Sequence, residues 1–120
     1  MAKILIHVTR GPEDPTRAAL AFLVAKSAAE EGHQVSLFLA GDAVQLLRDA
    51  VLDNLAGLGT GRLRESYEAL ASAGARFYLS GMSSGARGLL EADLDGKPAE
   101  LAQPSRLVQL LLDHERALTY

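Results

Sequence analysis

The chain has 120 residues, enough for one domain with a substantial core, and its hydrophobic and charged fractions of 48% and 22% are typical of globular proteins. A formal net charge of −3 and an aromatic content of 5%, with no Trp, argue against the basic surface or stacking platform that binds nucleic acids. No residue is cysteine, which excludes disulfides, thiolate metal ligands and cysteine nucleophiles.

The first predicted element is a strand over residues 3–9, a near-continuous apolar run typical of strands buried on both faces. We interpret His7 within it as a hydrogen-bonded core residue rather than a ligand. The run is too short for a signal peptide or a membrane span, so we expect a cytoplasmic protein without membrane contact. A helix follows from Pro15 to about Glu31, with Asp14 as its N-cap and Gly32 as its stop.

Two more strands and two more helices are predicted after this helix. A second strand is predicted over residues 35–40 and helical spacing over residues 43–49, an order that requires a parallel strand pair with a right-handed crossover. Residues 54–61 contain three glycines and are predicted to form a loop, where a partner could bind. Residues 62–72 predict an amphipathic helix, and residues 75–80 predict the third strand.

The last third of the chain is predicted to complete the sheet. Its segments are a weakly helical stretch over 83–90, an acidic turn over 91–96, a short edge strand over 97–102, a Leu-rich helix from an N-cap at Ser105 to about Asp113, and a strand over 117–120. Pro98 is tolerated only at an edge or at a strand start. The sequence therefore predicts an α/β fold, a three-layer α/β/α sandwich with about five mostly parallel strands, as one domain over residues 1–120.

The ends of the first three predicted strands place three turns at one edge of the sheet, where ligands bind in open α/β folds. Free N–H groups at the following helix starts favour an anion. The candidate ligand-binding residues are Arg10, Gly11, Asp14, Gly41, Asp42, Ser80, Gly81, Met82, Ser83 and Arg87. The alternative is that these are structural turns, because Gly and Ser recur between strands and helices for conformational reasons.

No catalytic or metal site is predicted. Residues 81–85 match the G-x-S-x-G nucleophile elbow with Ser83 at its centre, but the sequence identifies no base for this serine. The chain is also too short for the larger sheet of an α/β-hydrolase. Scattered acidic residues on helices are usually solvated, so no metal ligands are assigned. We therefore expect a binding protein rather than an enzyme, with no cofactor.

Three blocks of the sequence resemble the DsrE/DsrF-like (YchN-like) family: residues 11–18, Gly41-Asp42, and residues 77–83 with 86–88. The third block is the most specific, and the resemblance extends over essentially the whole chain. It implies a small flavodoxin-like sandwich and assembly into homotrimers, homohexamers or hetero-hexamers. It also implies a link to sulfur relay, because the best-understood members pass persulfide sulfur through a cysteine in the turn after the third strand.

At the position that is often cysteine in similar proteins, this chain has Ser80. A serine hydroxyl is far less acidic than a thiol and forms no sulfur–sulfur bond, so this chain cannot carry a persulfide. We therefore expect a non-catalytic DsrE-like protein that binds a small ligand or anion at the strand ends. The alternatives are a cysteine-free subunit that pairs with a related sulfur-relay protein, and an enzyme of undefined class that uses the pocket around Arg10, Asp42 and Ser80.

The predicted last helix supports an oligomer independently of the resemblance. Its apolar residues are Leu107, Val108, Leu110, Leu111 and Leu112. One short sheet has little room to bury all of them, and exposed apolar surface of this kind often marks a protein interface. We therefore expect a homo-oligomer, a trimer or a hexamer. The alternative is that these side chains complete the core.

Overall fold

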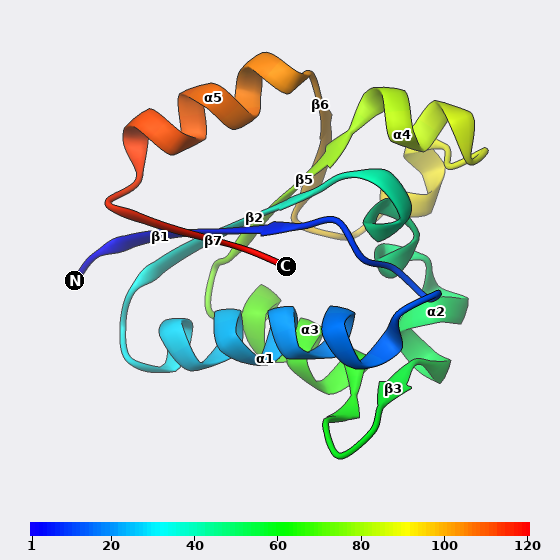
Figure 1. The fold of residues 1–120 in the computed structure, drawn as a ribbon, viewed down its shortest axis with the longest axis horizontal. Helices are drawn as coiled ribbons and strands as arrows, with labels where there is room; N and C mark the ends of the chain where they lie inside the picture. Colours follow the sequence, from blue (N-terminus) through cyan, green and yellow to red (C-terminus); the bar gives the residue numbers. More distant parts are fainter.

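The computed structural model describes all 120 residues (Figure 1). Its main sheet contains β1 (Lys3–Val8), β2 (Gln34–Leu39), β5 (Arg76–Ser80), β6 (Ala99–Ala102) and β7 (Arg116–Thr119). The α-helices are α1 (Pro15–Glu30), α2 (Asp49–Asn54), α3 (Leu63–Ser72), α4 (Gly81–Ala86) and α5 (Pro104–Asp113). Two 3-10 helices, η1 (Gly41–Leu47) and η2 (Glu91–Leu94), and a small hairpin of β3 (Ala56–Gly57) and β4 (Gly61–Arg62) complete the fold.

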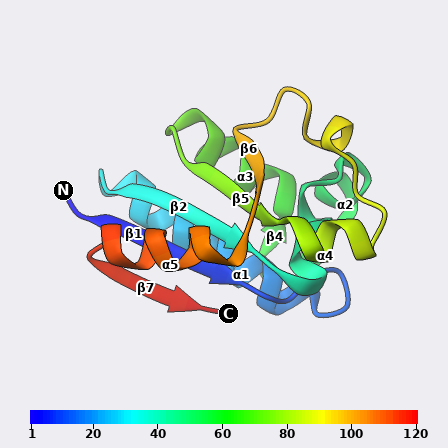
Figure 2. The ribbon, with the colours of Figure 1, turned by 90° about the horizontal axis from the view of Figure 1, so that it is seen from above.

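The main sheet has the strand order β6-β5-β2-β1-β7, and every neighbouring pair is parallel. The predicted α/β fold with a parallel sheet is therefore confirmed. Because all strands run the same way, their carboxyl ends lie along one side of the sheet, as Figure 2 shows. Strand β6, which follows Pro98, is at an edge of the sheet. The missing N–H of Pro98 therefore costs the sheet no hydrogen bond.

The two faces of the sheet are covered unequally. Helices α1 and α3 lie on one face, whereas α5 lies on the other (Figure 1). The α1/α3 side holds a cluster of 24 buried apolar residues, including Phe22, Tyr67 and Phe77, whose rings pack together. The α5 side holds a cluster of only four, namely Leu5, Phe38, Tyr78 and Leu110. The longest helix, α1, has 16 residues, and none of the helices combines the length and apolar character needed to cross a membrane.

Helix α5 is held to the sheet by few contacts. Leu110 is its one buried residue, whereas Val108, Leu111 and Leu112 remain exposed, as expected for a helix too apolar for one short sheet. The following His114 has a buried side chain, with Nδ1 donating to the Leu110 carbonyl at 2.7 Å and Nε2 accepting from Ser36 Oγ at 3.1 Å. These bonds anchor the C-terminal end of α5 to β2.

Several predicted boundaries are wrong. Ser105 is not the N-cap of α5: the helix begins at Pro104 with Gln103 as the cap, because proline lacks an N–H and its φ suits the first helical position. Residues 54–61 do not form a plain loop, since α2 continues to Asn54 and β3 pairs antiparallel with β4. Residues 43–49 are largely the 3-10 helix η1, and regular α-helix begins only at Asp49.

The helix after the third strand is shorter than the predicted 83–90. Helix α4 starts at once after β5 and ends at Ala86. Gly88 adopts a φ of +69°, in the left-handed region that ends helices, and this terminates the segment. The last strand is found at residues 116–119 rather than 117–120, and the other predicted strand ends differ by a residue or two, a normal uncertainty of such boundaries.

Candidate functional site

The turns that follow β1, β2 and β5 meet at the carboxyl edge of the sheet. Gly11 lies against the next turn so closely that a Cβ atom on it would be 2.1 Å from the carbonyl oxygen of Asp42. In the third turn, Ser83 Oγ accepts a hydrogen bond from the N–H of Gly41 at 2.9 Å. The fold thus brings together segments that are about 30 to 70 residues apart in the sequence.

The polar groups at this junction bond mainly to one another. Ser80 is the N-cap of α4, and its Oγ accepts from the N–H of Ser83 at 3.2 Å. Arg87 Nε donates to Asp42 Oδ1 at 2.9 Å, and its Nη1 donates to the Ser83 carbonyl at 3.2 Å. Ser80 is only 9% exposed. These side chains therefore hold the turns together and present few free groups to a ligand.

The remaining candidates of the first turn lie at the start of α1. Asp14 caps this helix, since its Oδ1 accepts from the N–H of Arg17 at 3.4 Å. Arg10 is exposed and forms no hydrogen bond or ion pair within the chain. Neither side chain bonds to the second or third turn.

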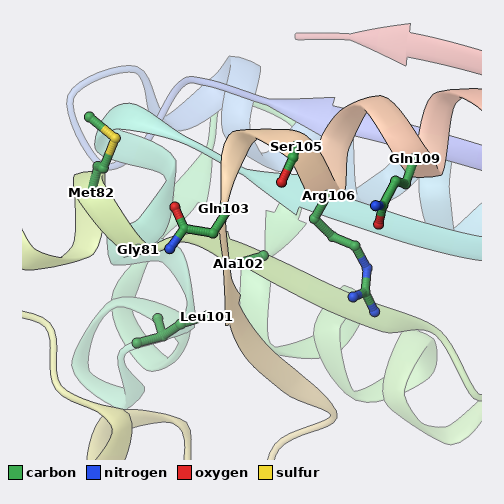
Figure 3. Close-up of a pocket in the computed structure, with 8 residues that line it drawn as sticks. All are labelled: Gly81, Met82, Leu101, Ala102, Gln103, Ser105, Arg106 and Gln109. Atoms are coloured by element: carbon green, nitrogen blue, oxygen red, sulfur yellow. The ribbon is translucent and has the colours of Figure 1, made fainter.

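A hollow of about 590 Å³ lies beside this junction, on the α5 face of the sheet (Figure 3). It is lined by Gly81, Met82, Leu101, Ala102, Gln103, Ser105, Arg106 and Gln109. Of these eight, only Gly81 and Met82 are among the candidates from the sequence. The other six come from β6, from the first two turns of α5 and from the residue between them.

One cation and two amides supply the polar chemistry of the hollow. The guanidinium of Arg106 lies 4.9 Å from the ring centre of Tyr78, and its Nη2 is 3.4 Å from Glu100 Oε1. The side chains of Gln103 and Gln109 form no hydrogen bond within the chain. Figure 3 shows Arg106 and Gln109 projecting from the same side of α5. The amide donors of Gln103 and Gln109 are therefore free to bond a ligand on the α5 face, where Ala102 supplies apolar surface.

The sequence did contain a signal for this second half of the site. The segment from Ala102 to Arg106 is a fourth strand–helix junction, because the edge strand is followed directly by the last helix. In a parallel sheet, the end of this strand must lie on the same side as the other three. A prediction that included every strand end would have placed Gln103 and Arg106 beside Gly81.

The titratable groups with shifted pKa values lie outside the hollow. Burial lowers the pKa of His7 in β1. Its Nδ1 is 3.4 Å from Oγ1 of Thr119 in β7, at the margin of the sheet opposite β6 and the hollow. A hydrogen bond from Arg64, reinforced by Lys97, lowers the pKa of Asp49. No group of three or more His, Cys, Asp or Glu side chains is placed to hold a metal ion.

The sequence model of the DsrE/DsrF-like family matches residues 2–120. The chain belongs to the DsrE/DsrF-like family. A comparison with curated proteins gave no match. The family membership and the absence of cysteine together mean that this DsrE/DsrF-like protein cannot pass sulfur through a thiol of its own, because Ser80 ends β5 where the resemblance places a cysteine.

Solved structures show the same fold as this DsrE/DsrF-like chain. The ychN protein from E. coli is similar over 100% of this chain and 100% of its own, with a TM-score of 0.77 and 20% identity. The protein of unknown function MTH1491 from Methanobacterium thermoautotrophicum is similar over 100% of both sequences, with a TM-score of 0.75 and 14% identity. The conserved protein BT1422 from Bacteroides thetaiotaomicron has a TM-score of 0.72 and 14% identity, covering 99% of this chain and 95% of its own.

Proposed function

We propose that this DsrE/DsrF-like protein binds a small anion that carries an apolar part, in the hollow between α4 and α5, and that it does so as a non-catalytic homo-oligomer. The observation that supports this most is the position of Arg106, with the free amides of Gln103 and Gln109, at the carboxyl side of a parallel sheet. The guanidinium and amides suit a carboxylate or phosphate oxygen. Met82 and Ala102 suit an apolar group.

The start of α5 adds to the positive character of the hollow. The first turn of this helix contains no acidic residue. Pro104 has no N–H, and the N–H of Arg106 donates to the Gln103 carbonyl at 2.9 Å. The N–H of Ser105 has no acceptor within the helix, as is usual for a first turn, and Ser105 lines the hollow. The partial positive charge of the helix end therefore adds to that of Arg106.

Binding can be tested with two simple probes, inorganic phosphate and butyrate, followed by backbone amide NMR shifts. We expect saturable shifts at Gly81, Ala102 and Ser105. The variant Arg106→Ala is expected to weaken binding about tenfold or more, because a hydrogen bond to a charged group contributes about 1.5–3 kcal/mol. As a control, Arg17→Ala removes an exposed arginine outside the hollow and should leave the affinity unchanged. Shifts that do not saturate, or that are the same in Arg106→Ala, contradict the proposal.

The homo-oligomer is supported by the exposed apolar residues of α5. Val108, Leu111 and Leu112 all lie on one helix that a single sheet leaves half uncovered. We expect sedimentation at micromolar concentration to show a trimer or a hexamer, and a stable monomer contradicts this part of the proposal. Co-expression with a cysteine-bearing relative tests the alternative role, since replacement of the homo-oligomer by a mixed complex indicates a subunit of a sulfur-relay-type assembly.

A further inference from the structure

Strand β7 is an edge strand without cover. It pairs with β1 alone, and all four of its residues are exposed. Figure 2 shows it along one margin of the sheet, at the side opposite β6. An edge strand with free N–H and C=O groups is a template for pairing with another chain. The side chains of β7 are also exposed on both faces, so no helix or loop of the same chain blocks the approach of a second sheet.

The hydrogen bonds of β7 show which of its backbone groups are free. Tyr120 donates its N–H to the His7 carbonyl at 2.8 Å, and its own carbonyl accepts from the N–H of Thr9 at 2.8 Å. Backbone groups along a strand point alternately to one side and the other, so Leu118, which lies opposite Ile6, also faces β1. The N–H and C=O groups of Ala117 and Thr119 therefore point away from the sheet.

We propose that β7 pairs antiparallel with β7 of a second copy of this chain, across a two-fold axis that passes beside Leu118. In this register Ala117 of each copy lies opposite Thr119 of the other copy. Each such pair exchanges two hydrogen bonds, so every outward N–H and C=O of both residues in both copies is satisfied. The two sheets then become one continuous sheet of ten strands.

Other registers leave backbone groups unsatisfied. An axis beside Ala117 places Thr119 opposite Glu115, whose N–H already donates to the Lys3 carbonyl at 2.9 Å. The Thr119 carbonyl then has no donor. An axis between two residues pairs an outward residue with an inward one and breaks the ladder. The register beside Leu118 is the one that uses the whole free edge.

The side chains of β7 suit the same register. Leu118, which is 50% exposed, comes to lie opposite itself in a pair without mutual hydrogen bonds, where side chains approach most closely. Arg116 comes opposite Tyr120 of the second copy, and a guanidinium is attracted to the face of a phenol ring. On the other face Ala117 lies opposite a threonine. No two like charges are placed in opposition.

The position of β7 is fixed by contacts within one copy. Lys3 of β1 forms an ion pair with Asp113 at the end of α5, and this ion pair lowers the pKa of Asp113. Strand β7 itself is held within one copy by its parallel pairing with β1. The pairing is independent of ligand binding, because β7 and the hollow beside β6 lie at opposite margins of the sheet. A two-fold contact also fits a hexamer of three pairs and does not by itself close a trimer.

The test uses the absence of cysteine, which makes any introduced thiol unique. Directly opposed residues without mutual hydrogen bonds have Cα atoms about 4.5 Å apart, within the range of a disulfide. We expect Leu118→Cys to form a disulfide-linked dimer on oxidation with diamide at micromolar concentration, at least about tenfold faster than Leu58→Cys at an exposed hairpin position. Thr119→Cys and Ala117→Cys are the register controls, since their counterparts across the axis lie beyond about 7 Å.

The outcomes separate the possibilities. If Leu118→Cys cross-links no faster than Leu58→Cys, the pairing is wrong, even if sedimentation still shows an oligomer. If Ala117→Cys cross-links fastest, the proposed axis is wrong. Ala117→Pro removes one outward N–H and leaves the bonds to β1 in place, a change that edge strands tolerate. In the Leu118→Cys background it should slow the cross-link to the Leu58→Cys rate, while Ala117→Ser should not.

Discussion

Replacement of Phe77 by alanine is expected to lower the free energy of unfolding by about 3–5 kcal/mol. Phe77 is fully buried in β5, and its ring centre lies 5.9 Å from that of Phe22 and 5.5 Å from that of Tyr67. The cavity left by the ring lies between α1, α3 and the sheet, inside the larger of the two buried apolar clusters. Domains are stable by only about 5–15 kcal/mol, so a loss of this size leaves a marginal protein.

Urea denaturation followed by far-ultraviolet circular dichroism measures this change. The matched control is Leu58→Ala, because Leu58 is 92% exposed and its truncation should change stability by less than about 0.5 kcal/mol. A loss below about 1 kcal/mol for Phe77→Ala would mean that the α1/α3 side is not the tightly packed core of the protein.

The variant Gly11→Ala is expected to be destabilised by about 1–3 kcal/mol, the usual cost of overpacking. The added methyl group would lie 2.1 Å from the carbonyl oxygen of Asp42, and a backbone atom cannot turn aside as a flexible side chain can. The first and second turns must therefore separate. Because Asp42 bonds to Arg87 and Gly41 to Ser83, we expect the disturbance to reach α4.

Gly85→Ala is the control for this second variant. A Cβ on Gly85 meets nothing within 4 Å, and the residue lies inside α4, where alanine is favoured over glycine by about 0.5–1 kcal/mol. Chemical denaturation should show opposite signs for the two variants. Amide shifts at Gly41 and Ser83 should change in Gly11→Ala. Equal stability of the two variants would show that the turns do not meet as described.

The sheet and its order of elements follow from the sequence because their signals are local. The apolar run before Thr9 and the glycine at position 32, with a φ of +91°, each act over a few residues and predict a strand and a helix end directly. The edge position of β6 was similarly predictable from Pro98. The resemblance to the DsrE/DsrF-like family predicts the complete fold, a small flavodoxin-like sandwich.

The chemistry of the site was less predictable because it depends on contacts between distant residues. Spacing places Ser83 and Arg87 at the sheet edge, but it does not show that they bond to Gly41 and Asp42 rather than to a ligand. Arg106 is not among the residues predicted from the sequence, because it follows the edge strand, whose end lies beside the three turns only once the strand order is known. The 3-10 geometry of η1 was missed because apolar spacing over seven residues resembles that of an α-helix.

The unequal cover of the two faces has a consequence for the order in which the molecule opens. The last seventeen residues are joined to the rest by the four-residue cluster under α5, by the pairing of β7 with β1 and by the contacts of His114 and Asp113, whereas the α1/α3 side keeps its larger core without them. Amide hydrogens of α5 and β7 should therefore exchange with solvent through a local opening that costs less than global unfolding. Newly made chains can assemble four of the five strands before this tail arrives, and it docks last.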